Sequence, residues 1–134
     1  MAETGFCKIT HDPRKEIRVT HLLYDLLRSR AVPTEKFRHL VLFKPLPGTT
    51  DEQLDEIIED FNALYPLTGG AEAGILIATV ARNLDDRKGY TLVEYVEFRD
   101  VEAFLAWHAH PAHTEFATRM SKLMDVWVVG DMNF

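Results

Sequence analysis

The chain has 134 residues, of which 46% are hydrophobic and 27% charged, and its formal net charge is −6. This length fits one domain with one hydrophobic core, and the composition is globular rather than disordered. The acidic charge and the lack of a basic stripe argue against nucleic acid as a partner, and no apolar run approaches the roughly 18 residues of a membrane span.

The N-terminal segment MAETGFCK lacks the basic region and apolar stretch of a secretory signal. The lone Cys7 cannot form a disulfide within the chain. We therefore expect a cytoplasmic protein, and we assign Cys7 no catalytic role.

The first predicted element is a helix that opens at Asp12-Pro13 and ends at Ala31-Val32-Pro33. A cap residue followed by proline is a typical helix start. We expect this helix to pack on the domain, because a stripe of five aliphatic residues is typical of core; a lid over a barrel mouth and an extended dimer contact are the alternatives. The stripe consists of Val19, Leu22, Leu23, Leu26 and Leu27.

The rest of the chain predicts a β-α-β-β-α-β order, the ferredoxin-like arrangement of the α+β class. Short β-rich runs bounded by turn residues predict the strands, and apolar stripes with acidic first turns predict the helices. The two middle strands are expected to pair as an antiparallel hairpin. The predicted elements are strand 37–43, helix 49–66, strand 73–81, strand 90–98, helix 100–124 with a break at Pro111, and strand 125–132.

Two of these strands, AGILIATVA at 73–81 and the VWVV segment at 126–129, are apolar on both faces. Two crossover helices cover only one face of a sheet, so the second face needs another cover. A second copy of the chain is the simplest cover, which predicts a homodimer with two sheets face to face. The alternative is the N-terminal helix, but a helix about 10 Å wide is narrower than four strands spaced about 4.8 Å apart.

Four motifs lie at defined places in this arrangement, which are the first strand, the third strand, the end of the third strand and the helix break. They are RHLVLFK at 38–44, GYTLV at 89–93, VEFRD at 96–100 and HPAH at 110–113. Together they resemble the stress-responsive dimeric α/β-barrel (Dabb) family over residues 37–134, which leaves 1–36 as an N-terminal extension. The resemblance implies a ferredoxin-like protomer, a dimeric α/β barrel and no organic cofactor. Some members are plant polyketide (olivetolic acid) cyclases that close a ring by aldol condensation, whereas many others are known only as stress-induced proteins.

In the cyclase-like members, the second histidine of HPAH and a tyrosine six residues before it bind and deprotonate the substrate, and a first-strand histidine shares their pocket. The matching residues here are His113, Trp107 and His39. An imidazole can take a proton near neutral pH, but it can also bond backbone groups freed at a helix break, so both roles stay open for His113. Trp107 departs from the family pattern, because an indole N–H donates one hydrogen bond and cannot exchange a proton as a phenol does.

His39 alternates with Val41 and Phe43, so the three are expected to point into the barrel and line its pocket; a satisfied core histidine is the alternative for His39. The helix residues Ile57, Ile58 and Phe61 match pocket-wall positions of the cyclase-like members, although a core role explains them more simply.

Glu94 shares strand parity with Leu92, which we also expect to line the pocket. A carboxylate on an apolar face is costly unless it is paired, so Glu94 could orient or activate a histidine. The opposite orientation, with Tyr95 inward and Glu94 outward, stays open because both faces are apolar.

His108, His110 and His113 are close in sequence, as metal ligands often are. Their spacing is not that of a usual helical pair, Pro111 interrupts it, and no cysteine or carboxylate cluster completes the set. We therefore expect no metal.

The sequence favours a small-molecule-binding dimeric α/β barrel that acts as a cofactor-independent acid/base enzyme, cyclase-like or lyase-like, on a small apolar carbonyl or phenolic compound. His113 would be the base, and His39, Trp107 and Glu94 would position the substrate. The alternative is a non-catalytic stress-response or ligand-binding dimer in which HPAH is structural. An open cavity of a few hundred Å³ beside His113 favours the enzyme.

Overall fold

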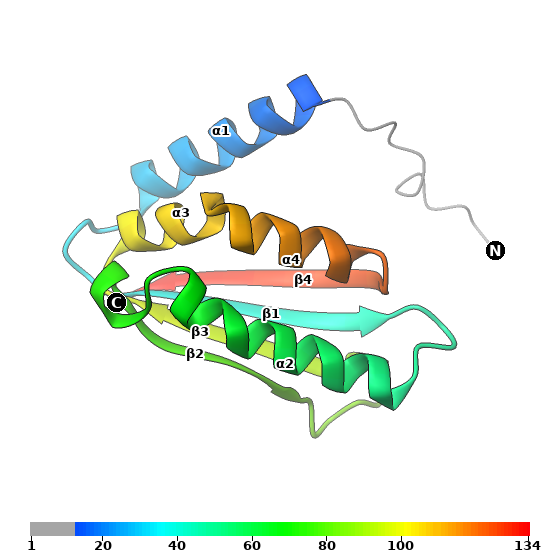
Figure 1. Cartoon of the computed structure of the whole chain (residues 1–134). Helices are drawn as coiled ribbons and strands as arrows, with labels where there is room; N and C mark the ends of the chain where they lie inside the picture. Colours follow the sequence, from blue (N-terminus) through cyan, green and yellow to red (C-terminus); the bar gives the residue numbers. More distant parts are fainter. Residues whose placement is uncertain (1–12) are drawn as a thin grey trace. The chain divides into compact units, whose positions relative to one another are not determined.

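The computed structural model describes residues 13–134, with side chains from residue 21 onward. The chain divides into two units between Arg30 and Ala31, and helix α1 (Pro13–Arg30) belongs to the first (Figure 1). The predicted cap Asp12 and the lone Cys7 lie outside the described residues. That α1 packs on the rest of the protein stays a prediction.

The second unit has the predicted β-α-β-β-α-β order, and the long helix is broken at Pro111 as expected. Two strands begin two residues later than predicted, β2 at Ile75 and β3 at Leu92. For β2 the cause is local: Ala73 belongs to a 3₁₀ turn, and Gly74 has φ +86. A side chain at Gly74 would also clash, because its Cβ would lie 2.9 Å from the Cβ of Ala103. The elements are β1 (Phe37–Pro45), α2 (Asp51–Leu67), η1 (Gly70–Ala73), β2 (Ile75–Arg82), β3 (Leu92–Phe98), α3 (Val101–Ala109), α4 (Pro111–Ser121) and β4 (Met124–Asn133).

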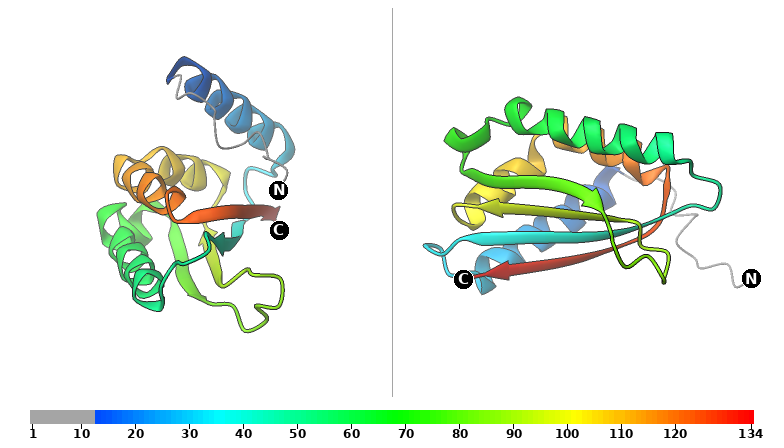
Figure 2. Two further views of the ribbon diagram at one scale, coloured as in Figure 1. Left: turned by 90° about the vertical axis from the view of Figure 1, so that its right-hand side faces the viewer. Right: turned by 90° about the horizontal axis from the view of Figure 1, so that it is seen from below.

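The four strands form one antiparallel sheet in the order β2-β3-β1-β4. The middle strands β2 and β3 pair with each other, as predicted. Helices α2, α3 and α4 all lie on one side of the sheet and leave the other side open (Figure 2). The predicted ferredoxin-like α+β fold is therefore confirmed.

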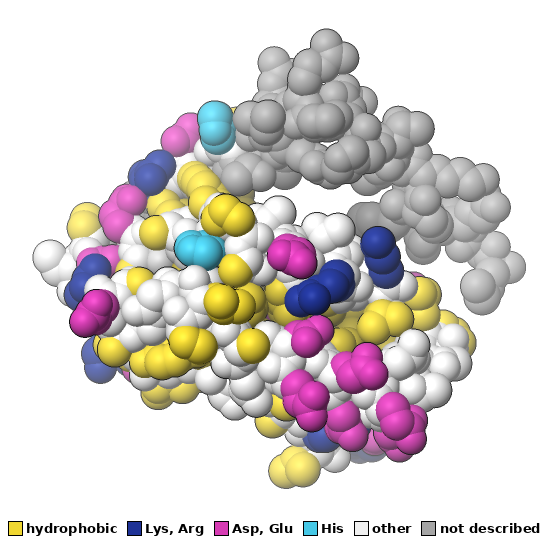
Figure 3. Space-filling model, viewed as in Figure 1, with side chains coloured by type: hydrophobic (Ala, Val, Ile, Leu, Met, Phe, Trp, Pro, Cys, Tyr) yellow, Lys and Arg dark blue, Asp and Glu magenta, His cyan; other side chains and the backbone are white. Residues whose placement is uncertain are grey.

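Helix α2 starts with a capping box in which Thr50 accepts from the Gln53 N–H and the Gln53 side chain accepts from the Thr50 N–H. Its inner face buries Leu54, Ile57, Phe61 and Leu64. Acidic side chains gather over its outer face (Figure 3) and keep that surface in water; they include Asp51, Glu52, Asp55, Glu56 and Glu59.

The strands present alternate residues to the two faces of the sheet. On β1, His39, Val41 and Phe43 are buried under the helices, and the residues between them face the open side. The prediction that His39 points into the barrel is therefore wrong: His39 lies 4.9 Å from the Phe104 ring of α3, centroid to centroid. Alternation identifies residues that share a face, but it does not say which face the helices cover.

The open face of the sheet carries exposed apolar side chains from both edge strands. Ile77 on β2 and Val128 on β4 are 46% and 49% exposed, and Val126 and Met132 accompany them. Among the described helices, none is long and apolar enough to span a membrane.

Candidate functional site

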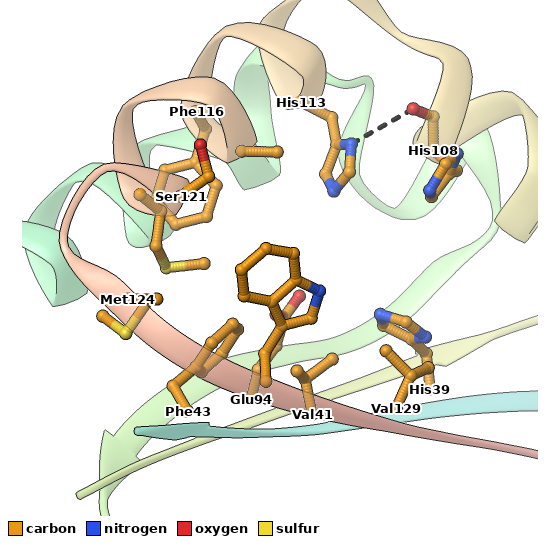
Figure 4. Close-up of a pocket in the computed structure, with 13 residues that line it drawn as sticks. His39, Val41, Phe43, Glu94, His108, His113, Phe116, Ser121, Met124 and Val129 are labelled. Carbon is orange, nitrogen blue, oxygen red and sulfur yellow. Dashed lines mark hydrogen bonds between the residues drawn. The ribbon is translucent and has the colours of Figure 1, made fainter. Parts of the chain in front are cut away.

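A cavity of about 170 Å³ lies between the helical layer and the sheet (Figure 4). Its floor is deep, since His39 and Glu94 are only 7% and 4% exposed, whereas Trp127 and Val129 on the edge strand β4 are each 50% exposed and form the rim. The cavity is lined by His39, Val41 and Phe43 of β1, Glu94 of β3, His108 of α3, His113, Phe116, Ala117, Met120 and Ser121 of α4, and Met124, Trp127 and Val129 of β4.

The break between α3 and α4 explains the local order of the HPAH motif. His110 has extended backbone (φ −65, ψ 135), and Pro111 has no N–H to continue the α3 hydrogen bonds. The Ala112 N–H donates to His110 Nδ1 at 3.1 Å, so the first histidine of the motif is the N-cap of α4. His110 therefore has a structural role.

The same break releases the backbone carbonyl of His108, which a continuous helix would bond to Ala112. His113 Nδ1 lies 3.1 Å from this oxygen. A carbonyl only accepts hydrogen bonds, so Nδ1 carries the proton and Nε2 keeps its lone pair. Figure 4 shows the other ring nitrogen of His113 directed into the cavity.

Burial lowers the pKa of His113 to about 4, and the neighbouring His108 adds to the effect. Burial also lowers the pKa of His108. Both imidazoles are therefore neutral at pH 7. A neutral His113 can accept a hydrogen bond or a proton through Nε2, but its surroundings do not stabilise the charged form.

Trp107 is buried behind the cavity and does not line it. Its ring centroid lies 4.1 Å from that of His113 and 6.0 Å from that of His39. The indole thus fixes the position of the two imidazoles instead of reaching the space between them.

His39 pairs with a residue that the sequence did not single out. Asp131 on β4 is its direct cross-strand partner, and His39 Nδ1 lies 2.6 Å from Asp131 Oδ1. The ring also packs against Phe104, with a centroid separation of 4.9 Å. The contact with the Asp131 carboxylate and the packing against the Phe104 ring together hold the imidazole of His39 in one orientation.

Glu94 faces the helices with Leu92, so the open question of its orientation is resolved in favour of the interior. Burial raises the pKa of Glu94 to about 7; His39 opposes this shift and Asp131 adds to it. A substantial fraction of Glu94 is therefore protonated near neutral pH, and a protonated carboxyl can donate a hydrogen bond.

The structure brings His113, His39, Val41, Phe43 and Glu94 together around one cavity. The other predicted site residues lie elsewhere. Leu92 is completely buried, Phe61 packs on Phe116 with ring centroids 5.7 Å apart, Ile57 contributes to a separate groove between α2 and α4, and Ile58 is half-buried on α2.

Sequence reasoning missed the β4 wall of the cavity and, apart from His113, the α4 wall. The alternation of β4 does put Trp127, Val129 and Asp131 on one face, but the sequence does not show which face. Within residues 13–134, no three histidine, cysteine or carboxylate side chains are placed to hold a metal ion.

Residues 37–134 match the family described as stress responsive A/B barrel domain. Among solved structures, a hydroxynitrile lyase from Passiflora edulis is similar, with a TM-score of 0.65 and 23% identity over 76% of this chain and 95% of that chain. A dimeric ferredoxin-like protein of unknown function from Thermobifida fusca gives 0.65 and 18% over 75% and 92%, respectively. A Dabb family protein with a ferredoxin-like fold from Mesorhizobium loti gives 0.62 and 18% over 73% and 95%. No curated protein matches the chain.

Proposed function

The chain belongs to the stress responsive A/B barrel domain family, and we propose that it is a homodimer that binds a small, largely apolar carbonyl or phenolic compound and acts on it by acid/base chemistry of the lyase type. One observation carries this proposal: three imidazoles, those of His39, His108 and His113, and the protonatable carboxyl of Glu94 border the same apolar cavity. Perturbed titratable groups that converge on a cavity are typical of functional sites.

The size and polarity of the cavity define the ligand class. A cavity of roughly 150 Å³ with apolar walls holds a benzene molecule, so the 170 Å³ here suits one ring or a short aliphatic chain. Its apolar walls, which include Phe43, Phe116 and Met120, disfavour a charged ligand. A carbonyl or hydroxyl oxygen could accept from protonated Glu94, and a hydroxyl group could also donate to an imidazole.

A lyase reaction uses these groups without a co-reactant. A pocket imidazole takes the proton of a substrate hydroxyl; the O–H electrons form a C=O bond while the neighbouring C–C bond breaks. The departing carbon keeps the electron pair of the broken C–C bond. It then takes up the proton that the imidazole had accepted, so the protein ends unchanged. The likeness to a protein described as a hydroxynitrile lyase supports this reaction class.

A cyclase of the polyketide type is the less favoured variant. The cyclase-like members of the family use a tyrosine at the position of Trp107, and here the indole is buried outside the cavity. The pair of His113 with a phenol that such a ring closure uses is therefore incomplete.

The homodimer is supported by the open face of the sheet, where Ile77 and Val128 are about half exposed. Apolar faces of this kind need a cover, and a second copy supplies one of matching shape. The similar protein from Thermobifida fusca is described as dimeric.

The proposal is tested with the full-length protein and a panel of hydroxynitriles, β-hydroxyketones, simple aldehydes and phenols. We expect at least one compound to raise the melting temperature and at least one hydroxy compound to release its carbonyl product, detected by absorbance. Ala117→Leu, which fills the cavity, should abolish both effects; Ala106→Leu, on the exposed side of α3, is the matched control.

Binding without turnover would favour the alternative, a non-catalytic ligand-binding dimer. If no compound binds, the remaining form of that alternative is a stress-response dimer in which the HPAH motif is structural.

A further inference from the structure

Two of the three pocket imidazoles, those of His39 and His113, differ in the group that accepts a hydrogen bond from Nδ1. His39 Nδ1 faces the carboxylate of Asp131 at 2.6 Å, and the two side chains are only 9% and 17% exposed. His113 Nδ1 faces the backbone carbonyl of His108 at 3.1 Å. Because carboxylates and carbonyls only accept, each ring in its neutral form keeps the lone pair on Nε2.

We infer, on the basis of the proposed function, that Asp131 is the positioning residue that makes His39 the proton acceptor of the pocket, while His113 stays neutral and orients the substrate by accepting a hydrogen bond. Asp131 acts through His39 and does not line the cavity itself.

The charge of the group next to each ring decides which of the two histidines, His39 or His113, accepts the proton. When an imidazole accepts a proton, the new positive charge is stabilised by a carboxylate in contact with it, and much less by a carbonyl. His39 has that carboxylate. The lowered pKa of His113, about 4, shows that its surroundings oppose a charged ring.

The geometry of the sheet fixes this pair. His39 and Asp131 are directly opposite each other on β1 and β4, where cross-strand side chains are close enough to interact. The ring of His39 cannot turn freely, because Phe104 and Trp107 lie 4.9 and 6.0 Å from it, centroid to centroid. Asp131 thus sets both the proton position and, with the aromatic rings, the orientation of His39.

The other titratable groups that line the cavity with His39 are compatible with this assignment. Glu94, opposite Val41 on β3, lies on the same face two residues along, and its carboxyl is partly protonated at neutral pH because burial raises its pKa to about 7. His108 and His113, from α3 and α4, are neutral at that pH because burial lowers the pKa of each. A proton that reaches His39 therefore meets Asp131 as its nearest fixed counter-charge.

The first test reads the proton position and needs no ligand. Long-range proton–nitrogen NMR on isotope-labelled, full-length protein, with His39 assigned by its loss in His39→Gln, should show the Nδ1–H form of His39 at neutral pH. In Asp131→Ala the Nδ1–H population should fall, whereas Asp125→Asn, an exposed change on the same strand, should leave it unchanged. A native protein with the proton on Nε2, or an Asp131→Ala protein with an unchanged spectrum, would overturn the inference.

The second test reads turnover with the hydroxy compound that the panel identifies. Asp131→Asn keeps the size of the side chain but removes its charge, and it should lower kcat by about 10²-fold or more while KM changes little. An Asp131→Asn enzyme with native kcat contradicts the inference even if the protein remains a lyase. If the native protein turns over no compound, the proposed function fails, and the NMR result still decides whether Asp131 controls the proton of His39.

Discussion

The two faces of the sheet each bury one carboxylate of β3, and they surround it differently. On the open face, Glu97 Oε1 lies 2.9 Å from Arg38 Nε, and the Arg38 guanidinium lies 3.7 Å from the ring centroid of Phe134. On the helix-covered face, Glu94 lies near His39 and Asp131, and burial raises its pKa to about 7. The two carboxylates are three residues apart, but Glu97 is in an ion pair, whereas Glu94 can change its charge near neutral pH.

We propose that this difference separates a surface for association from a site for chemistry. A fixed ion pair surrounded by exposed apolar residues, such as Ile77 and Val128, can specify how a second copy docks. Groups whose charge changes near pH 7 can move protons during a reaction. The two proposed functions would use alternate residues of the same strands.

The largest expected effect is on dimer association, and it comes from a carboxylate placed on the open face of β4. Val128 and Val129 are neighbours with almost equal exposure, 49% and 50%, but Val128 lies on the open face and Val129 at the rim of the cavity. Val128→Asp should weaken dimer association by more than about 10³-fold, because an unpaired carboxylate on each copy would be buried. Light scattering at micromolar concentration should then show a monomer.

Val129→Asp is the matched control for that experiment. It should leave the dimer intact and instead weaken binding of apolar ligands at the rim. If both variants remain dimeric, or if the native protein is a monomer, the open face is not the dimer interface.

The next effect concerns the two imidazoles of the helix-covered face. His39→Gln should lower turnover by about 10²-fold or more, because glutamine cannot take a proton. His113→Gln retains a hydrogen-bond acceptor and should lower turnover by less than about tenfold. Steady-state kinetics with the same substrate compare the two, and the reverse order of effects would make His113 the base.

Much of this contrast could be predicted from the sequence, but the assignment of faces could not. Periodicity and turn residues predicted every strand and α-helix of the second unit but not the 3₁₀ helix η1, and Pro111 predicted the helix break. The alternation of β1 led to the expectation that His39 points into the barrel. Because both faces of the sheet are apolar, alternation alone does not show which face His39 lies on.

Asp131 was missed for a related reason. The ferredoxin-like order places the last strand beside the first, but no short turn joins β1 to β4, and a turn is what fixes register locally. The pair of His39 with Asp131 spans 92 residues of sequence. Glu94, in contrast, could be recognised as a candidate because a carboxylate among apolar residues of its parity is unusual.

A third prediction compares the two carboxylates through stability. The pKa of Glu94 is about 7 in the fold against 4.5 for an ordinary glutamate, so the folded protein binds the extra proton between these values and loses up to about 3 kcal/mol of stability as pH rises through them. Glu94→Gln mimics the protonated form. It should match the native protein near pH 4.5 and exceed its unfolding free energy by that amount above pH 7, measured by urea denaturation.

Glu97→Gln, on the open face, is the control, and it should change the unfolding free energy in the opposite direction. It leaves the guanidinium of Arg38 without its carboxylate partner, and we expect a loss of about 1–3 kcal/mol at neutral pH. A Glu94→Gln protein that is less stable than the native one at pH 8 would mean that the fold stabilises the charged form of Glu94 instead of raising its pKa, and the contrast between the faces would disappear.

The smallest expected effect separates fold from chemistry within the HPAH motif. His110 caps α4 by accepting from the Ala112 N–H at 3.1 Å, so His110→Ala should cost about 1 kcal/mol of unfolding free energy. His110→Asn should recover most of that loss, because asparagine is a favoured N-cap residue. Both variants should keep native kcat, since the Nδ1 proton of His113 is held by the carbonyl of His108 and not by His110. A His110→Asn protein with full stability but little turnover would place His110 in the reaction and show that the first histidine of the motif does more than start a helix.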